Sequence, residues 1–215
     1  MMTFFQPVHE VSPSGLPLGS YGMPGGPGVR FCGPRDPGRE ELEAFVAAAF
    51  QQQHGATVRS FLPVLVGLRD TDGFLGGVAG YHPANDEPLY LEQYLAGPVE
   101  AEIARRLGRQ QISRTAVAEI GNFACRNCVL AMTMVGVLAR HLLEQEHDWV
   151  VFTATRTVRG IMRHMGLRLV ELQQARPAQL MAAPDQWGRY YDQDPRVMFG
   201  YVPSWHESVR PGQEG

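Results

Sequence analysis

The sequence predicts an α/β (α+β) fold in which helices cover both faces of one mixed β-sheet. A hairpin pattern comes first, over residues 61–81, and residues 117–172 then alternate between strand and helix patterns. Such an order is typical of a mixed sheet with helices on both faces. The chain has 215 residues, 44% of them hydrophobic, and shows neither an internal repeat nor a linker between two cores, so we expect one domain.

The two ends of the chain are predicted to lie outside this domain. Residues 1–38 are rich in Gly and Pro and predict an irregular arm, although their aromatic and apolar residues leave an ordered edge open. Residues 39–203 form the expected domain, and residues 204–215 form a tail. The domain begins with a predicted helix over residues 39–53, which has acidic residues in its first turn and Gly55 after its end.

A hairpin and a further extended segment are expected next. Residues 61–68 and 73–81 predict paired strands, and the second is so rich in Gly that we expect something to approach its backbone closely. Residues 89–95 alternate like a strand, on which Glu92 is either an exposed carboxylate or part of an acceptor site. A short helix is predicted over residues 98–106.

The central segment is a strand over residues 117–124, a polar break over residues 125–128 and a long apolar helix. Alternation places Glu119 and Phe123 on one face of the strand and Asn122 on the other. A carboxylate in a mostly apolar strand is costly to bury unless it is paired or used. The free N–H groups at the start of the helix favour an anionic or carbonyl ligand in the break.

The C-terminal half supplies the rest of the sheet. The predicted elements are a strand over 149–155, a helix over 156–165, a strand over 167–172, a short helical piece over 177–181, an aromatic turn over 187–191 and a last strand over 196–202.

Composition narrows the function. The formal charge of −3 argues against broad electrostatic binding to nucleic acid or to an anionic membrane. All 19 basic residues are Arg, which excludes Schiff-base catalysis and a P-loop lysine. The sequence has no recognisable signal peptide and no apolar run of membrane-spanning length, so we expect a cytoplasmic protein without an integral membrane segment.

The cysteines predict no metal site. Cys125 and Cys128 have CxxC spacing, but the sequence offers no second ligand pair beside scattered His residues. We interpret them as two thiols at a strand-to-helix turn. The low and odd count of three Cys is typical of a reducing compartment.

Several segments taken together resemble the thermostable hemolysin family. They are LEQYL at residues 91–95, EIGNFA at 119–124, VFTAT at 151–155 and WGRYY at 187–191. That family is similar to the N-acetyltransferase (GNAT) superfamily and, within it, to acyl-homoserine-lactone synthases. The resemblance implies a GNAT-like acyltransferase domain that moves an acyl group from a thioester to an amino acid or related amine.

The same resemblance implies an acyl donor on phosphopantetheine, carried by acyl carrier protein or by coenzyme A, and no permanently bound cofactor. Acetyl-CoA-binding members usually carry a Gly-rich loop after the central strand, whereas residues 125–131 contain no Gly. We therefore expect acyl carrier protein to be the preferred donor and partner. The pantetheine arm is expected to fill a gap between the strands ending at Ala124 and Thr155, like a short extra strand.

Candidate site residues follow from the resemblance and from the residue types. The candidates for acceptor binding or proton removal are Glu119, Glu92 and Asn122. The candidates for holding the donor are Phe123, Ala124, Arg126, Asn127, Thr153 and Thr155. Further candidates for substrate contact are Gln93, Arg114, Tyr190 and Tyr191.

Structural alternatives stay open for these residues. Glu119 is either a proton acceptor or a core carboxylate paired with an Arg such as Arg114, and Asn122 either binds substrate or caps the bend. Arg126 either meets a phosphate or is solvated. The threonines are either pantetheine ligands or ordinary β-branched strand residues, and the tyrosines either protonate the leaving thiolate or pack.

Two other functions are also left open by the sequence. One is a membrane-lytic protein, as the family's name suggests, although no long amphipathic segment supports it. The other is a non-catalytic module that binds acyl groups or a carrier protein and has lost turnover.

Overall fold

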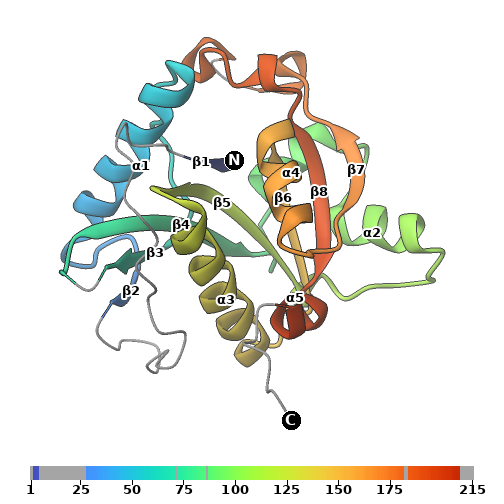
Figure 1. Cartoon of the computed structure of the whole chain (residues 1–215). Coiled ribbons are helices and arrows are strands. Elements are labelled where there is room, and N and C mark those ends of the chain that lie inside the picture. The colour runs from blue at the N-terminus through green and yellow to red at the C-terminus, as the bar shows by residue number, and fades with distance from the viewer. Residues whose placement is uncertain (1, 5–27, 71, 86, 182–183, 209–215) are drawn as a thin grey trace.

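The computed structural model describes residues 2–4, 28–70, 72–85, 87–181 and 184–208. Within these residues the chain forms an eight-stranded mixed sheet of order β2-β3-β4-β5-β1-β6-β8-β7, with helices on both faces (Figure 1). This confirms the predicted fold class. The strands are β1 Met2–Phe4, β2 Val29–Cys32, β3 Val64–Arg69, β4 Leu75–Pro83, β5 Val117–Cys125, β6 Trp149–Ala154, β7 Val170–Gln174 and β8 Arg196–Tyr201.

The helices divide between the two faces of the sheet. The α-helices are α1 Arg39–His54, α2 Val99–Leu107, α3 Cys128–Glu144, α4 Arg156–His164 and α5 Val202–Ser208. The short 3-10 helices are η1 Tyr90–Tyr94, η2 Arg114–Ala116, η3 Pro177–Gln179, η4 Pro184–Trp187 and η5 Tyr191–Gln193. One apolar core joins α1, α2 and η1 to one face of the sheet, and a second core joins α3, α4 and α5 to the other face.

The central strand β5 is buried along its whole length because it lies between these two cores. It pairs antiparallel with β4 and parallel with both β1 and β6. Because both faces of β5 are covered, its sequence is mostly hydrophobic on both faces. The predicted hairpin is confirmed as β3 and β4, which are paired antiparallel.

A β-bulge in β5 corrects the predicted faces of this strand. Gly80 pairs with Gly121 and Val78 pairs with Ala124, so Asn122 and Phe123 together lie opposite a single residue of β4. Asn122 takes a left-handed φ of 46° at this point. The extra residue turns Phe123 to the α3 face, where it joins the second core, and not to the face of Glu119 as expected.

The segment predicted as a third strand, residues 89–95, is a 3-10 helix instead. Glu92 explains the difference, because its carboxylate accepts hydrogen bonds from the backbone N–H groups of Leu89 (2.7 Å) and Val99 (2.8 Å). These bonds fold the segment back on itself and cap the start of α2. An alternating pattern of seven residues is too short to exclude such a local turn.

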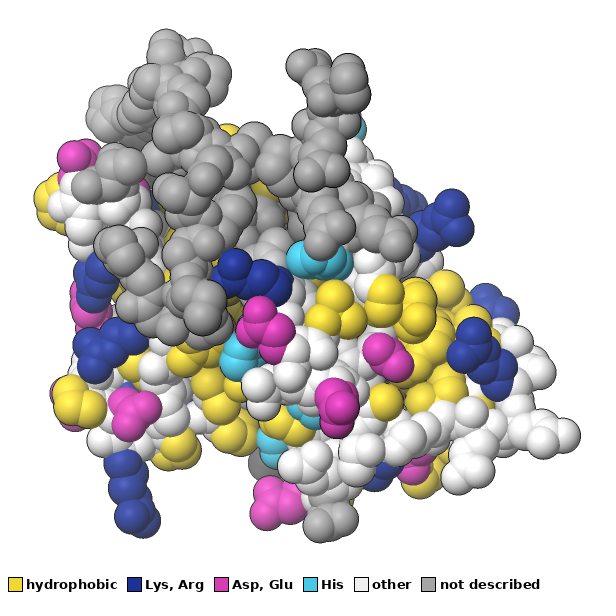
Figure 2. Space-filling view, turned by 90° about the horizontal axis from the view of Figure 1, so that it is seen from below, with side chains coloured by type: hydrophobic (Ala, Val, Ile, Leu, Met, Phe, Trp, Pro, Cys, Tyr) yellow, Lys and Arg dark blue, Asp and Glu magenta, His cyan; other side chains and the backbone are white. Residues whose placement is uncertain are grey.

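The expected irregular arm is also corrected in part. Strands β1 and β2 both fall inside residues 1–38 and belong to the sheet, while residues 5–27 lie outside the described residues. At the other end, α5 extends into the expected tail, and residues 209–215 again lie outside the described part. On the face shown in Figure 2, Arg and acidic side chains are interspersed and not gathered into a field of one sign.

Candidate active site

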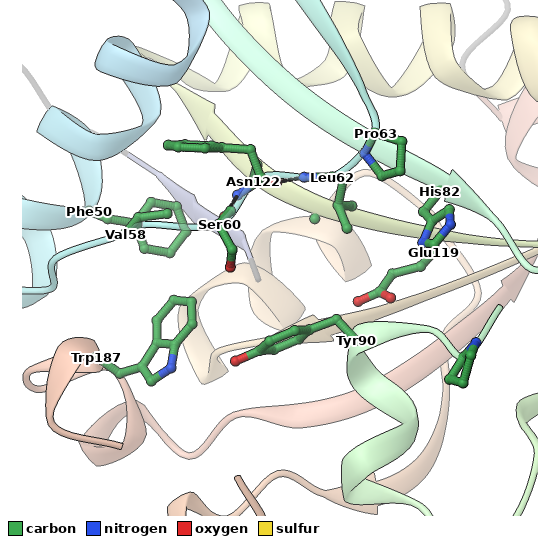
Figure 3. Close-up of a pocket in the computed structure, with 13 residues that line it drawn as sticks. Phe50, Val58, Ser60, Leu62, Pro63, His82, Tyr90, Glu119, Asn122 and Trp187 are labelled. Atoms are coloured by element: carbon green, nitrogen blue, oxygen red, sulfur yellow. Dashed lines mark hydrogen bonds between the residues drawn. The ribbon is translucent and has the colours of Figure 1, made fainter. Parts of the chain in front are cut away.

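A cavity of about 320 Å³ opens on the α1 and α2 face of the sheet, beside the bulge in β5. Its walls come from α1, the segment before β3, β4, β5, η1 and η4. In Figure 3, Tyr90 and Trp187 lie on one side, Ser60 and Asn122 lie on the other, and the Glu119 carboxylate points into the space between them. The lining residues are Phe50, Val58, Ser60, Phe61, Leu62, Pro63, His82, Pro88, Tyr90, Glu119, Gly121, Asn122 and Trp187.

Glu119 is the acidic residue of this lining, and its side chain is almost completely buried, with 2% of the residue exposed. Its Oε2 accepts a long hydrogen bond of 3.4 Å from the Leu91 N–H. Burial, offset only in part, raises the pKa of Glu119 to about 7. A carboxylate with this pKa exchanges protons near neutral pH, as a general base requires.

The expected alternative for Glu119, an ion pair with Arg114, is wrong. The Arg114 guanidinium binds Glu92 (Nη1 to Oε1, 2.7 Å) and Glu100 (Nη1 to Oε2, 2.7 Å) instead. It also donates to the backbone carbonyls of Asn85 and Glu87. Across β4, His82 pairs in register with Glu119 and is the neighbouring polar residue of the cavity lining.

Glu92 and Arg114 therefore form a structural clamp and do not line the cavity. Although burial opposes ionisation of Glu92, the hydrogen bonds from Arg114 and from the N–H groups of Val99 and Leu89 hold its pKa below the ordinary value. A carboxylate with so many donors is stable as an anion and is a poor proton acceptor. The structure thus separates two glutamates that the sequence had grouped together.

Asn122 ties the cavity wall to the sheet. Its Oδ1 accepts a hydrogen bond of 2.8 Å from the Leu62 N–H, and its Nδ2 donates to the Ser60 carbonyl at 3.4 Å. The same wall is held from behind by Arg39, which donates to the carbonyls of Leu62 (2.9 Å) and Pro63 (2.8 Å). Both groups of the Asn122 amide are engaged, so this side chain positions the wall.

The other residues predicted to contact substrate support the cavity from outside its lining. The Tyr190 hydroxyl donates to the Thr153 carbonyl (3.2 Å), and the Tyr191 hydroxyl lies 2.6 Å from that of Tyr94. The Gln93 amide donates to the Tyr90 carbonyl at 2.7 Å. These bonds fix the aromatic layer behind Tyr90 and Trp187.

Two of the predicted donor-binding side chains cap helices. Asn127 Oδ1 accepts from the Leu130 N–H (2.9 Å) at the start of α3, and Thr155 Oγ1 accepts from the Val158 N–H (3.4 Å) at the start of α4. Both helices thus begin at the carboxyl ends of neighbouring strands. Arg126 is exposed and lies with its guanidinium carbon 5.8 Å from the centre of the Phe45 ring.

The gap expected between β5 and β6 exists, but it is occupied. The two strands pair directly only from Val117–Ile120 to Trp149–Phe152. Beyond these residues β1 lies between them, with Met2 beside both Phe123 and Ala154, and Thr3 beside Ala124 (Figure 1). The segment Met2–Phe4 thus takes the position predicted for the pantetheine arm.

Several lining residues were not found from the sequence, above all Tyr90, His82, Ser60 and Trp187. One signal for the Ser60 wall was present, because the Gly-rich strand predicted a close approach. That approach is confirmed at Gly80, where an added Cβ would lie 3.0 Å from the Leu62 Cβ. Trp187 belongs to the WGRYY segment that carried the family resemblance, but nothing in the sequence placed its side chain in the cavity.

Residues 32–205 match the family model described as "Thermostable hemolysin". The chain matches none of the curated proteins with which it was compared. None of the helices in the described part of the chain combines the length and hydrophobicity needed to cross a membrane.

Solved structures share the fold at low sequence identity. TofI in an apo form is 14% identical with a TM-score of 0.58, covering 84% of this chain and 94% of that chain. The AHL synthase LasI is 15% identical with a TM-score of 0.56, covering 86% and 98%. FeeM, an N-acyl amino acid synthase from uncultured soil microbes, is 15% identical with a TM-score of 0.55, covering 84% and 94%. The expected likeness to acyl-homoserine-lactone synthases is confirmed at the level of the fold.

Proposed function

The chain belongs to the thermostable hemolysin family, and we propose that it is an N-acyltransferase that moves an acyl group from a thioester to a primary amine. The observation that carries the proposal is the placement of Glu119. The Glu119 carboxylate is buried and faces a cavity with aromatic walls. It lies on β5, which stops pairing with its parallel neighbour β6 one residue later, after Ile120. Solved structures with the same fold include an N-acyl amino acid synthase and an AHL synthase, which supports the reaction class.

The proposed reaction needs a neutral amine, an aligned thioester and donors for the developing oxyanion. The amine enters the cavity, and Glu119 accepts its proton as the nitrogen bonds to the acyl carbon. The carbon–sulfur bond then breaks, and the leaving thiolate takes a proton to become a thiol. Tyr90 lines the cavity beside Glu119, and burial raises the pKa of its hydroxyl, so it stays protonated and is the proposed proton donor.

The donor is proposed to be an acyl group on a carrier protein in preference to the same group on coenzyme A. The start of α3 carries side chains where glycines would let the backbone wrap a diphosphate, and Val129 there is half exposed. The exposed residues Arg156 and Arg163 on α4 offer charge to an acidic carrier helix. Arg159 does not, because it is buried and paired with Asp194 at 2.9 Å.

Acyl thioesters of this kind are made inside cells, so the proposed activity agrees with the expected cytoplasmic location. The direct test is to incubate the purified protein with acyl carrier protein or acyl-CoA donors and a panel of amines and amino acids. Mass spectrometry should detect N-acyl products that depend on the protein. Binding of the donor without any product across the panel would contradict the proposal and favour a non-catalytic binding module.

The membrane-lytic alternative is tested in a parallel experiment. Liposomes loaded with a fluorescent dye are mixed with the pure protein, first alone and then with donor and amine. If the proposal is right, leakage appears only after N-acyl product has formed, because such products are surfactant-like. Prompt leakage with the protein alone would contradict this account of the family's name.

A further inference from the structure

We propose that the acceptor is an amine with an aromatic or apolar body and without a carboxylate, such as an arylalkylamine. The inference rests on the acyltransferase function proposed above and concerns the chemistry of the same cavity. Its basis is a buried acid, aromatic walls, a described lining without Arg, and the engagement of Arg39 and Arg114 in other contacts.

The described lining carries negative charge and no guanidinium. Glu119 is its acidic residue, and none of the described residues that form the cavity is Arg. An ammonium group is therefore matched in this cavity, whereas a carboxylate meets no side chain of fixed positive charge among the described lining residues.

Two of the cations that lie near the cavity wall, Arg39 and Arg114, are already bound. Arg39 contacts the Leu62 and Pro63 carbonyls and also pairs with Glu43 at 2.7 Å. Arg114 is held between Glu92 and Glu100. Turning either guanidinium toward a substrate carboxylate would break several charge-assisted hydrogen bonds, so the fold disfavours that use of them.

The walls fit an aromatic amine. Tyr90 and Trp187 lie at an angle of 60° with ring centres 6.2 Å apart, and Phe50 and Phe61 complete the apolar lining. Aromatic faces bind flat apolar bodies and attract ammonium groups through the ring quadrupole. The volume of about 320 Å³ accommodates a small aromatic amine beside the end of an acyl thioester.

The test compares matched acceptor pairs with one fixed donor: tyramine against tyrosine, and phenethylamine against phenylalanine. The expected result is a kcat/KM at least about tenfold higher for each amine, because the amino acid brings an unmatched carboxylate beside Glu119. Equal or better use of the amino acids would overturn this inference and leave the acyltransferase intact. Acylation of none of the four compounds, or of any other amine, would instead overturn the proposed function.

A substitution adds an internal control to this comparison. Ser60 is exposed and points into the cavity in Figure 3, so Ser60→Arg places a guanidinium at the rim. The amine-to-amino-acid ratio of kcat/KM should fall severalfold in Ser60→Arg and stay near the wild-type ratio in Ser60→Gln, which adds bulk without charge. An unchanged ratio in Ser60→Arg, with the fold intact by circular dichroism, would count against the inference.

A different observation supports a second inference, that the segment Met2–Phe4 competes with the donor for the gap between β5 and β6. We infer this from the register alone, since β1 pairs with β5 along Phe123–Cys125 and with β6 at Ala154. Pairing of β1 uses backbone groups that an amide-rich pantetheine arm would otherwise meet. Donor binding then requires β1 to leave the sheet, and loosening β1 should tighten donor binding.

The test weakens β1 in the full-length chain. Thr3→Pro removes a backbone N–H in the middle of the strand, and Thr3→Val is the control that keeps it. Calorimetry should show that coenzyme A and a holo carrier protein bind severalfold more tightly to Thr3→Pro than to wild type or Thr3→Val. Equal or weaker binding to a folded Thr3→Pro protein would overturn the inference and make β1 a permanent strand of the sheet.

Discussion

The Leu62 N–H donates to Asn122 Oδ1 at 2.8 Å, and this bond joins the wall of the cavity to the bulge in the central strand. The bulge turns the Asn122 side chain toward the wall at a φ of 46°, while Phe123 faces the opposite core. The shape of the cavity thus depends on one inserted residue in β5.

Removing this tether should loosen the acceptor site. Asn122→Gly keeps the left-handed backbone but leaves the Leu62 N–H without its acceptor, which should cost about 1–3 kcal/mol of unfolding free energy. Asn122→Ala should lose about 1 kcal/mol more, because a Cβ disfavours that φ. Urea denaturation measures both, and the KM for the amine should rise in both variants. An Asn122→Gly protein with wild-type stability and KM would contradict the role given to the tether.

Glu119 should make the protein less stable as the pH rises. Its pKa in the folded protein, about 7, exceeds its ordinary value of 4.5, so the stability it contributes below pH 4.5 is lost as the pH rises through 7. Glu119→Gln removes this titration and should be more stable than wild type at pH 8 by up to about 3 kcal/mol. Urea unfolding at pH 5 and pH 8 checks this. If the stability difference between Glu119→Gln and wild type does not change with pH, the pKa of Glu119 is not raised in the folded protein.

The clamp between Glu92 and Arg114 should behave in the opposite way. Because the pKa of Glu92 is lowered, its contribution to stability is present above its ordinary value of 4.5 and is lost as the pH falls through the lowered pKa. Arg114→Gln should cost about 1–3 kcal/mol and move acid unfolding to a higher pH. The pH dependence of the reaction should be unchanged. Loss of activity in a fully stable Arg114→Gln protein would contradict the structural role and indicate that Arg114 contacts the substrate.

The proposed preference for a carrier-bound donor predicts that the KM for this donor depends on ionic strength. Reversing the exposed charges in the double variant Arg156→Glu/Arg163→Glu should raise the KM for the carrier-bound donor at low ionic strength and have little effect at high ionic strength, where these charges are screened. The KM for the same acyl group on coenzyme A should not change with salt in this way. Equal or better use of acyl-CoA, without any salt dependence for the carrier-bound donor, would contradict the proposed preference.

The sequence predicted the order of the main strands and helices because each has a strong local pattern. The central strand, its buried Glu119 and the helix after it were all visible, and so was the close approach at Gly80. Residues 89–95 were mispredicted because the capping bonds of Glu92 override a short alternation. The pattern also gave no sign of the bulge, since a single inserted residue changes the face of Phe123 without changing composition.

The site depended more on contacts between distant residues. The cavity combines the wall around Ser60 with Trp187, and neither position carries a signal that relates it to Glu119. Strand β1 is three residues long and pairs in parallel with strands more than a hundred residues away, so no local pattern could predict it. Glu92 and Arg114 were predicted as site residues, but they form a structural clamp. The sequence could not predict this ion pair, because the fold decides which residues far apart in the sequence meet.

The central claim is that Glu119 accepts the proton of the acceptor amine, and the pH dependence of kcat/KM tests it most directly. With a saturating donor and an arylalkylamine, wild-type kcat/KM should rise through an apparent pKa of about 7, the value expected for Glu119. Glu119→Gln should lower turnover by about 10²–10⁴-fold and abolish this limb of the profile. A folded Glu119→Gln protein with near wild-type turnover and the same pH profile would contradict the claim.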